Sequence, residues 1–213
     1  MANLKEIRSR ITSVGSTMQI TSAMKMVSAA KLKRAQDAIG RLRPYANKQT
    51  ELLSSLSGSL DNSDAGAYTQ KRGLKKIMIV TITSNRGLCG AFNSNIIKKS
   101  KNLAENDYAD ADVSFLTIGK KGSEFFAKNG FTVRSSHDSL YDELTFENTS
   151  AIAEDIMQNF LSGEFDKVIL VYNQFKNAAT QLVQAEQFLP VETPTEEGAT
   201  IGDYIFEPSK EEI

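Results

Sequence analysis

The sequence predicts an α/β protein made of one long N-terminal helix and a three-layer domain with a mostly parallel sheet. Two observations predict this. Residues 2–43 contain no proline and are rich in amino acids that favour helix, whereas residues after 74 alternate short apolar runs with helical patterns. Strands that alternate with helices along a chain are typical of a parallel sheet covered by helices.

The N-terminal helix is expected to be unusually long. Asn3 is suited to cap its start, Pro44 bends it without ending it, and Ser57 and Gly58 are the expected stop. A helix of roughly 50 residues is roughly 80 Å long. Such a length is typical of a coiled coil, a membrane span or a shaft.

Apolar spacing along this helix predicts a coiled-coil seam. Alternate steps of four and three residues connect Ile7, Ile11, Val14, Met18, Leu32, Ile39 and Leu42. The middle of the seam is polar, and there the apolar residues move to a neighbouring face that holds Ile20, Ala23, Met24, Val27 and Ala30. A shift of one position turns the stripe by roughly 100°. The helix should therefore have partners on more than one side between Met18 and Leu32.

Charge is distributed unevenly along the chain. Residues 1–50 hold ten Lys and Arg and two acids, a net charge of +8, although the whole chain carries −1. A basic arm of this kind suits nucleic acid, anionic lipid or an acidic protein surface, and a solvated helix face is the plain alternative. A membrane span is excluded because the apolar runs are interrupted by Lys25, Lys31, Lys33 and Arg34.

Two segments resemble a known family. Residues 20–36, ITSAMKMVSAAKLKRAQ, resemble the N-terminal helix of the gamma subunit of F-type ATP synthases, and residues 83–93, TSNRGLCGAFN, resemble that family's internal motif. The resemblance covers essentially the whole chain. It implies a Rossmann-like fold for the α/β part and a rotor shaft without a cofactor. Such a shaft couples proton flux through a membrane rotor ring to ATP synthesis or hydrolysis in a catalytic hexamer.

The same resemblance implies the partners and their contact residues. The alpha and beta subunits of the hexamer would be met by Met24, Lys25, Lys31, Lys33, Arg34 and Arg86. The membrane rotor ring and the epsilon subunit would be met by Tyr204, Phe206 and Glu207. The chain would then be a peripheral protein on the cytoplasmic face of the bacterial inner membrane.

The chain is expected to divide into four parts. Residues 1–57 form the shaft helix, and residues 58–74, dense in Gly, Ser, Asp and Asn, form a linker. Residues 75–190 form the α/β domain. Residues 191–213 form the foot and the start of a truncated C-terminal helix, because Ser209 and Glu212 are spaced as a capping box. The resemblance implies that the missing helix would wind antiparallel to the first.

The strands and helices of the α/β part follow from their apolar patterns. Strands are expected at 77–82, 112–118, 131–133 and 167–172, and helices at 91–105, 119–126 and 148–161. The run Gln181–Leu189 is expected to pair at a sheet edge.

The turn after the first strand, Ser84–Gly90, is where phosphate-binding loops occur. Neither G-x-G-x-x-G nor G-x-x-x-x-G-K-[ST] is present, and no acid lies where a ribose would need one. We therefore expect a tight structural turn or a protein-contact loop and no direct nucleotide binding. A Rossmann-type enzyme is disfavoured for the same reason.

Other catalytic chemistry is sparse. His137 is the only histidine, so no His-based metal cluster exists, and it is expected in an exposed loop. Cys89 has no neighbouring base in the sequence. The sequence predicts a protein that is not an enzyme. The alternative function is a nucleic-acid-binding module that uses the basic helix, although Tyr45 is the only aromatic residue in that arm.

Overall fold

The computed structural model describes residues 3–57 and 67–192, and the chain separates into two units after Leu53. The first unit is one helix and the second is an α/β domain. None of the helices in the described residues is long and apolar enough to cross a membrane.

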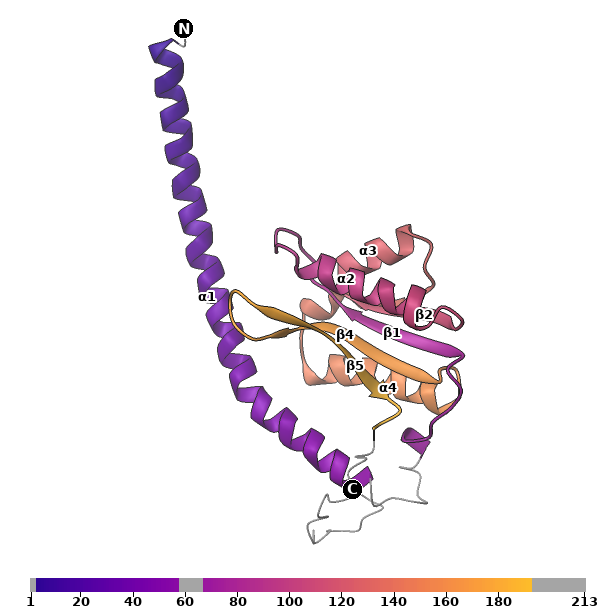
Figure 1. Cartoon of the computed structure of the whole chain (residues 1–213). Coiled ribbons are helices and arrows are strands. Elements are labelled where there is room, and N and C mark those ends of the chain that lie inside the picture. Colours follow the sequence, from indigo (N-terminus) through magenta and orange to yellow (C-terminus); the bar gives the residue numbers. More distant parts are fainter. Residues whose placement is uncertain (1–2, 58–66, 193–213) are drawn as a thin grey trace. The chain divides into compact units, whose positions relative to one another are not determined.

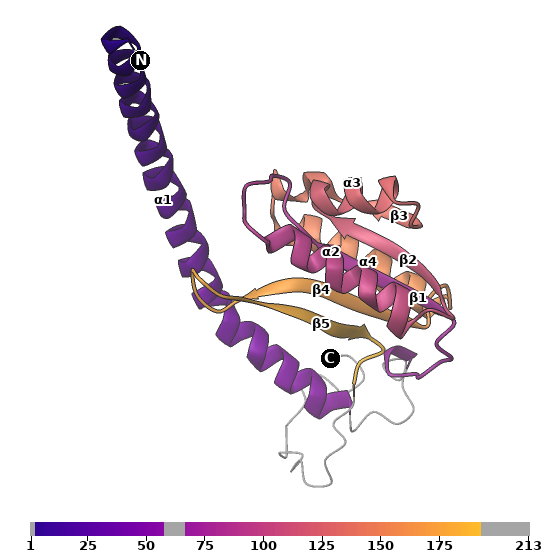
Figure 2. The ribbon, with the colours of Figure 1, turned by 45° about the horizontal axis from the view of Figure 1, so that its top comes forward.

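The first unit is formed by α1, Leu4–Ser57, which continues four residues past Leu53 and runs without interruption in Figures 1 and 2. Its 54 residues span about 80 Å at 1.5 Å per residue. The Asn3 Oδ1 accepts a hydrogen bond from the backbone N–H of Lys5 at 3.2 Å, so Asn3 satisfies one of the free donors at the helix start. Pro44 lies inside the helix and does not end it. The predicted long helix is confirmed.

The second unit is built on a five-stranded sheet in the order β3-β2-β1-β4-β5. The strands are β1 Lys76–Ile82, β2 Asp112–Ile118, β3 Val133–Ser136, β4 Lys167–Phe175 and β5 Gln181–Leu189. The first four are mutually parallel, whereas β5 pairs antiparallel with β4 at the edge. Both the mostly parallel sheet and the edge position of residues 181–189 are thus confirmed.

Helices cover both faces of this sheet, as Figure 1 shows. The helices are α2 Phe92–Asn102, α3 Lys120–Lys128 and α4 Phe146–Leu161, with a π turn at Leu103–Asp107 and a 3-10 turn at Asp138–Tyr141. Ile96 of α2 and Phe126 of α3 pack in one core, and Ile156 and Phe160 of α4 pack in the other. The predicted three-layer architecture is therefore confirmed.

Strand β1 shows why its apolar run predicted a buried strand. Ile77 and Ile79 point into the core under α2 and α3, and Met78 and Val80 point into the core under α4. Successive side chains of a strand alternate between faces, so a strand buried on both sides must be apolar throughout.

The end of β1 is held against the start of α3 by a close backbone approach. The Thr83 hydroxyl donates to the carbonyl of Gly119 at 3.0 Å and accepts from the backbone N–H of Gly122 at 2.8 Å. A Cβ on Gly119 would lie 2.1 Å from the Thr83 carbonyl oxygen, and Gly119 has φ +103°. Only glycine adopts that backbone conformation readily, so Gly119 is required for the turn.

The third strand lies further along the chain than predicted. It begins at Val133, not at Phe131. The backbone N–H of Phe131 donates to the Phe126 carbonyl at 3.1 Å, which closes the end of α3. The Phe131 ring packs edge-on against Phe115 at 5.4 Å between centroids. Its apolar character therefore serves the core from a turn and not from a strand.

Other boundaries differ by a few residues. Helix α4 begins at Phe146 because the Thr145 hydroxyl accepts from the Asn148 N–H at 3.2 Å and caps the helix. His137 is half-buried, and its backbone N–H donates to the Thr117 carbonyl at 2.8 Å. The exposed position expected for His137 was therefore wrong, because the backbone around it continues the edge of the sheet.

Part of the segment predicted to be a linker packs on the α/β unit. Tyr68 contacts the core beneath α4, and its carbonyl accepts from the Val191 N–H at 2.9 Å. Arg72 donates to the Phe160 carbonyl and stacks on the Phe160 ring with its guanidinium carbon 4.8 Å from the centroid. Residues 67–72 therefore add to the packing of the domain.

The edge pair β4–β5 carries a hydrogen bond that makes stability depend on pH. The Tyr172 hydroxyl donates to the Glu186 carboxylate at 2.7 Å. Burial, and then Glu186, raise the pKa of Tyr172 from 10.0 to about 12. The folded state holds this proton more tightly than the unfolded state does. Its contribution is therefore complete below pH 10 and is lost as the pH rises from 10 to about 12.

We expect Tyr172→Phe to remove this loss of stability at high pH. Urea unfolding of the wild type and the variant, followed at intervals from pH 8 to pH 12, measures the difference in their free energies of unfolding. That difference should shift in favour of the variant above pH 10, where only the wild type has a hydroxyl to ionise at this site. A difference that stays constant across the range would contradict the assignment.

Candidate functional site

The predicted coiled-coil seam is an exposed apolar line on α1. Its side chains are between 36% and 68% exposed: Ile7, Ile11, Val14, Met18, Leu32, Ile39 and Leu42. Apolar side chains repeated at this spacing on a helix are typical of a surface that a partner covers. The role of the individual residues stays a prediction.

A second apolar face lies beside the polar middle of the seam. Ile20, Met24 and Val27 are all exposed, and Met26 lies near them. The helix therefore carries exposed apolar side chains in two directions over the same few turns. One partner helix covers one seam, so two faces require more than one partner surface.

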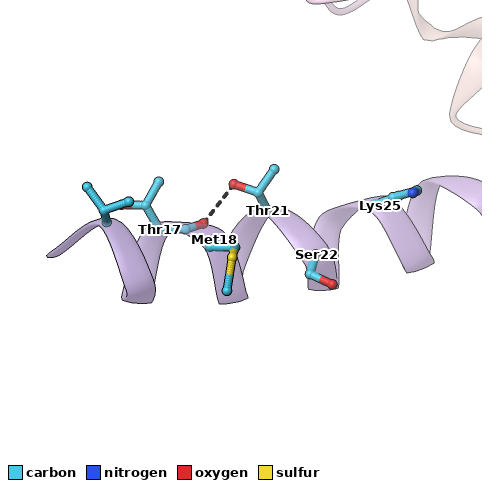
Figure 3. Close-up of a pocket in the computed structure, with 6 residues that line it drawn as sticks. Thr17, Met18, Thr21, Ser22 and Lys25 are labelled. Atoms are coloured by element: carbon cyan, nitrogen blue, oxygen red, sulfur yellow. Dashed lines mark hydrogen bonds between the residues drawn. The ribbon is translucent and has the colours of Figure 1, made fainter. Parts of the chain in front are cut away.

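The threonines in the polar middle of α1 need no hydrogen bond from a partner. A shallow hollow there is lined by Val14, Thr17, Met18, Thr21, Ser22 and Lys25 (Figure 3). The Thr21 hydroxyl donates to the Thr17 carbonyl at 2.7 Å, which Figure 3 marks. One helix alone cannot enclose a small molecule, so this hollow is not a ligand cavity.

Other threonines of α1 also donate their hydroxyls to backbone carbonyls of the same helix. Thr12 donates to Arg8, Thr17 to Ser13, and Thr50 to Ala46, in each case through the hydroxyl to the carbonyl four residues earlier, at 2.9–3.1 Å. Their hydroxyls are satisfied within the helix. A partner can therefore cover their methyl groups without leaving a buried donor unpaired.

The cations predicted to contact the hexamer differ in their pairing. Lys33 forms an ion pair with Asp37 at 2.9 Å. Lys25, Lys31 and Arg34 are exposed and have no ion-pair partner among the described residues. Unpaired cations beside apolar side chains suit a partner surface that supplies carboxylates.

The loop between β1 and α2 is organised by one asparagine of α2. The Asn93 Oδ1 accepts from the backbone N–H of Ser84 at 2.9 Å. Its Nδ2 donates to the Ser84 hydroxyl at 2.9 Å and to the Arg86 carbonyl at 3.3 Å, and lies 3.2 Å from the Cys89 sulfur. Bonds to three points of this nine-residue loop, 83–91, fix its conformation.

A second asparagine ties this loop to the neighbouring elements. The Asn85 Nδ2 donates to the Asp138 carbonyl at 2.7 Å, and its Oδ1 accepts from the Lys120 N–H at 2.9 Å. The Tyr141 hydroxyl donates to the Thr83 carbonyl at 2.8 Å, and burial raises the pKa of Tyr141. The loop is thus attached to both α3 and the 3-10 turn.

The tip of the loop presents two side chains to solvent. Arg86 is exposed, as its predicted contact requires, and its guanidinium has no ion-pair partner among the residues that the structure describes. Leu88 is fully exposed and has φ 60°. A leucine in this left-handed region is unusual and costs free energy.

The remaining predicted site residues cannot be placed. Tyr204, Phe206 and Glu207, and the capping box at Ser209 and Glu212, lie outside the described residues. Within the described residues, no three His, Cys, Asp or Glu side chains are grouped to hold a metal ion.

Sequence reasoning missed several residues of this region. No role was predicted for Leu88, Asn85 or Asn93, or for the exposed Leu144 and Phe146 beside the cap of α4. The motif itself contains Asn93, and an asparagine just inside a helix start, after a glycine-rich turn, is the signal that could have found it. The position of Leu88 left no such signal, because leucine has no preference for a positive φ.

Comparison with known proteins identifies what the chain is similar to. The family model described as ATP synthase matches residues 3–213. The ATP synthase gamma chain of Flavobacterium johnsoniae is 62% identical over all of this chain and 74% of that protein. The ATP synthase gamma chain of Cytophaga hutchinsonii is 46% identical over all of this chain and 75% of that protein.

Solved structures agree with the fold. The central stalk and c-ring of the Tetrahymena thermophila mitochondrial ATP synthase contains a chain with a TM-score of 0.59 and 29% identity, over 80% of this chain and 72% of that one. A rotor chain of the Euglena gracilis mitochondrial ATP synthase has a TM-score of 0.59 at 21% identity, over 84% of this chain and 60% of that one.

Proposed function

This chain belongs to the ATP synthase family as a gamma chain, and on that premise we propose that α1 stands inside the catalytic hexamer. Its role is that of the rotor shaft in the central stalk. The observation that supports the position of α1 is its pair of exposed apolar faces, at Val14–Met18 and at Ile20–Val27. A surrounding sleeve of subunits covers both faces, whereas one partner helix covers one.

The contacts proposed for the alpha and beta subunits follow the charge of α1. Lys25, Lys31 and Arg34 would meet carboxylates of the hexamer, because they are exposed and lack ion pairs within the described residues. Met24 would supply an apolar contact between them. Lys33 would exchange Asp37 for a hexamer carboxylate, and Arg86 would contact the hexamer from the α/β unit.

Rotation of such a helix would couple ion flow to chemistry. Lys25 lies on the same face as Val14 and Met18, whereas Lys31 and Arg34 lie on the far side of α1, so each catalytic site would meet a different surface as the shaft turns. A site that binds one face more tightly shifts its own conformational equilibrium when that face arrives. Proton flux through the membrane rotor ring would thereby drive ATP synthesis, and hydrolysis would drive the reverse rotation.

The C-terminal residues are proposed to form the foot. Tyr204, Phe206 and Glu207 would contact the membrane rotor ring and the epsilon subunit, within the division into a shaft at 1–57, a linker at 58–74, an α/β domain at 75–190 and a foot at 191–213. The chain would act on the cytoplasmic face of the bacterial inner membrane as a peripheral, non-catalytic subunit, without binding nucleotide or nucleic acid. The relatives described above are all parts of ATP synthases, so the nucleic-acid alternative has no support.

Co-elution with the hexamer tests this proposal. The chain is mixed with assembled alpha and beta subunits and passed over a size-exclusion column at low and at moderate salt. We expect one chain per hexamer at both salt concentrations, because apolar contacts persist where charge contacts are screened. Binding that disappears at moderate salt, together with retention on duplex DNA at low salt, would favour a basic helix of the nucleic-acid type.

A further inference from the structure

One dipeptide at the end of α3 carries both reacting groups of a self-modification reaction. Asn129 is followed by Gly130, and this is the only Asn-Gly pair in the sequence. Asparagine is thermolabile, because the backbone nitrogen of the next residue can attack its side-chain amide. A following glycine has no Cβ to shield that nitrogen, and it leaves the backbone free to reach the geometry of attack.

Both residues of the pair are exposed at the C-terminal end of α3, where Asn129 is the C-cap. Gly130 has φ 77°, and a Cβ there would meet no atom of the described residues within 4 Å. Because this position is open, the peptide unit between the two residues can rotate into solvent without displacing a neighbouring segment. Water, which the reaction also consumes, reaches the pair directly.

We propose that Asn129 is a site of spontaneous deamidation, which converts its side-chain amide into a carboxylate. The Gly130 nitrogen bonds to the Asn129 Cγ and loses its proton, while the Cγ–Nδ2 bond breaks and ammonia leaves. The intermediate is a five-membered succinimide ring. Water then opens the ring at one of its two carbonyls, which gives aspartate or isoaspartate. The reaction needs no partner, so it does not depend on the rotor function proposed above.

Two hydrogen bonds oppose this reaction, and both can open easily. The Asn129 Nδ2 donates to the Phe125 carbonyl at 2.8 Å, at an exposed position where water competes for both groups. The Gly130 N–H donates to the Ala127 carbonyl at 3.4 Å, which is longer than an ordinary hydrogen bond of this type. The last turn of a helix frays at a low cost in free energy. Fraying here releases the nucleophile and the amide together.

The aspartate product would weaken the end of α3. Its carboxylate would lie beside the Phe125 carbonyl oxygen, which now accepts from the Asn129 amide. Two oxygens without a hydrogen between them repel each other. A negative charge at a helix C-terminus is also unfavourable, because it lies at the negative end of the helix dipole.

The isoaspartate product would disturb the core as well. It inserts an additional methylene group into the main chain just before Gly130. The backbone N–H of Phe131, which donates to the Phe126 carbonyl at 3.1 Å, would be displaced. The Phe131 ring would then lose its edge-on contact with the Phe126 ring, whose centroid is 5.5 Å away.

Asn93 is an internal control in the same unit. It is followed by Ser94, and both residues lie inside α2. Its side chain is held by the bonds to Ser84 and Arg86 described above. Attack on this amide would require the start of α2 to unwind, so Asn93 should react much more slowly than Asn129.

Ageing of the full chain tests the proposal. The native chain and the same chain unfolded in urea are incubated at mildly alkaline pH, digested at acid pH and mapped by mass spectrometry. We expect native Asn129 to convert at a rate within about 10-fold of the unfolded chain, because only a frayed turn must open. A native chain that keeps the Asn129 amide while the unfolded chain loses it would overturn the site. Equal conversion of Asn93 and Asn129 in the native chain would also overturn it, because global unfolding would then set the rate.

Two variants test the structural consequence. Asn129→Asp is the aspartate product, and we expect its thermal midpoint about 2 to 4 °C below that of the wild type. Asn129→Gln is the matched control, since glutamine keeps a neutral amide and would have to form a larger ring, which closes more slowly. It should keep its mass through the same incubation. Equal midpoints for the two variants would overturn the weakening of α3.

Discussion

Replacing Val14 and Met18 together by aspartate should abolish docking of the chain in the hexamer. The two side chains are 67% and 68% exposed on one face of α1, so the free chain loses little packing when they change. In the assembled motor the same face would be covered. Two carboxylates would then be buried without partners, which costs several kcal/mol. We expect binding at least about 100-fold weaker.

The matched control carries the same charge change on the opposite face of the same turns. Thr12 and Ser16 lie about half a turn around the helix from Val14 and Met18, at 100° per residue. Thr12→Asp with Ser16→Asp lowers the net charge of α1 equally and lowers helix propensity similarly. The two double variants are compared by titration into the hexamer and by circular dichroism. Equal loss of binding in both would mean that the charge of α1, and not its seam, determines docking.

Gly119→Ala should destabilise the α/β unit by about 3 to 5 kcal/mol. The new Cβ would stand 2.1 Å from the Thr83 carbonyl oxygen and 2.7 Å from the carbonyl carbon, both of which are backbone atoms. Alanine would also be strained at φ +103°. Relief of the contact would move the end of β1 away from α3. Urea unfolding followed by the near-ultraviolet signal of the tyrosines measures the loss.

Gly130→Ala is the control for Gly119→Ala, because it adds a methyl group at a positive φ without a close contact. Gly130 also has a positive φ, +77°, but a Cβ there meets no atom within 4 Å. This control should lose only about 1 kcal/mol, the cost of the backbone conformation. The difference between the two variants is then the cost of the contact with Thr83 together with the additional backbone strain at Gly119, whose φ 103° and ψ 133° lie outside the left-handed helical region. Similar losses would show that the backbone moves to accommodate the methyl group at Gly119.

Most of the fold follows from local patterns. Strands β1 and β2 were predicted to within one residue because a parallel strand buried on both faces is a continuous apolar run, and no other element explains such a short run between turns. Helix α1 was predicted to its end for a similar reason, since the only proline before Gly58, Pro44, was expected to bend the helix without ending it. The assignment of Phe131 was wrong because an apolar residue in a turn can fill the core as well as one in a strand.

The candidate site was likewise predicted only in part from the sequence. The seam of α1 was predictable because helical periodicity alone brings its residues onto one line. The arrangement of the loop between β1 and α2 was not, because it depends on residues more than 50 positions away in the sequence. The hydrogen bond of Asn85 to Asp138 and that of Tyr141 to Thr83 hold the loop in place. Neither contact can be predicted from the local sequence.

The threonines of α1 have a consequence for friction. A shaft that turns inside a hexamer must break the bonds that it makes with the surrounding subunits at each angle where it pauses. The hydroxyls of Thr17, Thr21 and Thr50 already donate to carbonyls of their own helix, so these residues would offer the surrounding subunits mainly methyl groups. Contacts between methyl groups and apolar surface are weak individually and have no preferred direction. In the proposed position inside the hexamer, such a surface would act as a bearing, with low barriers between successive angles of rotation.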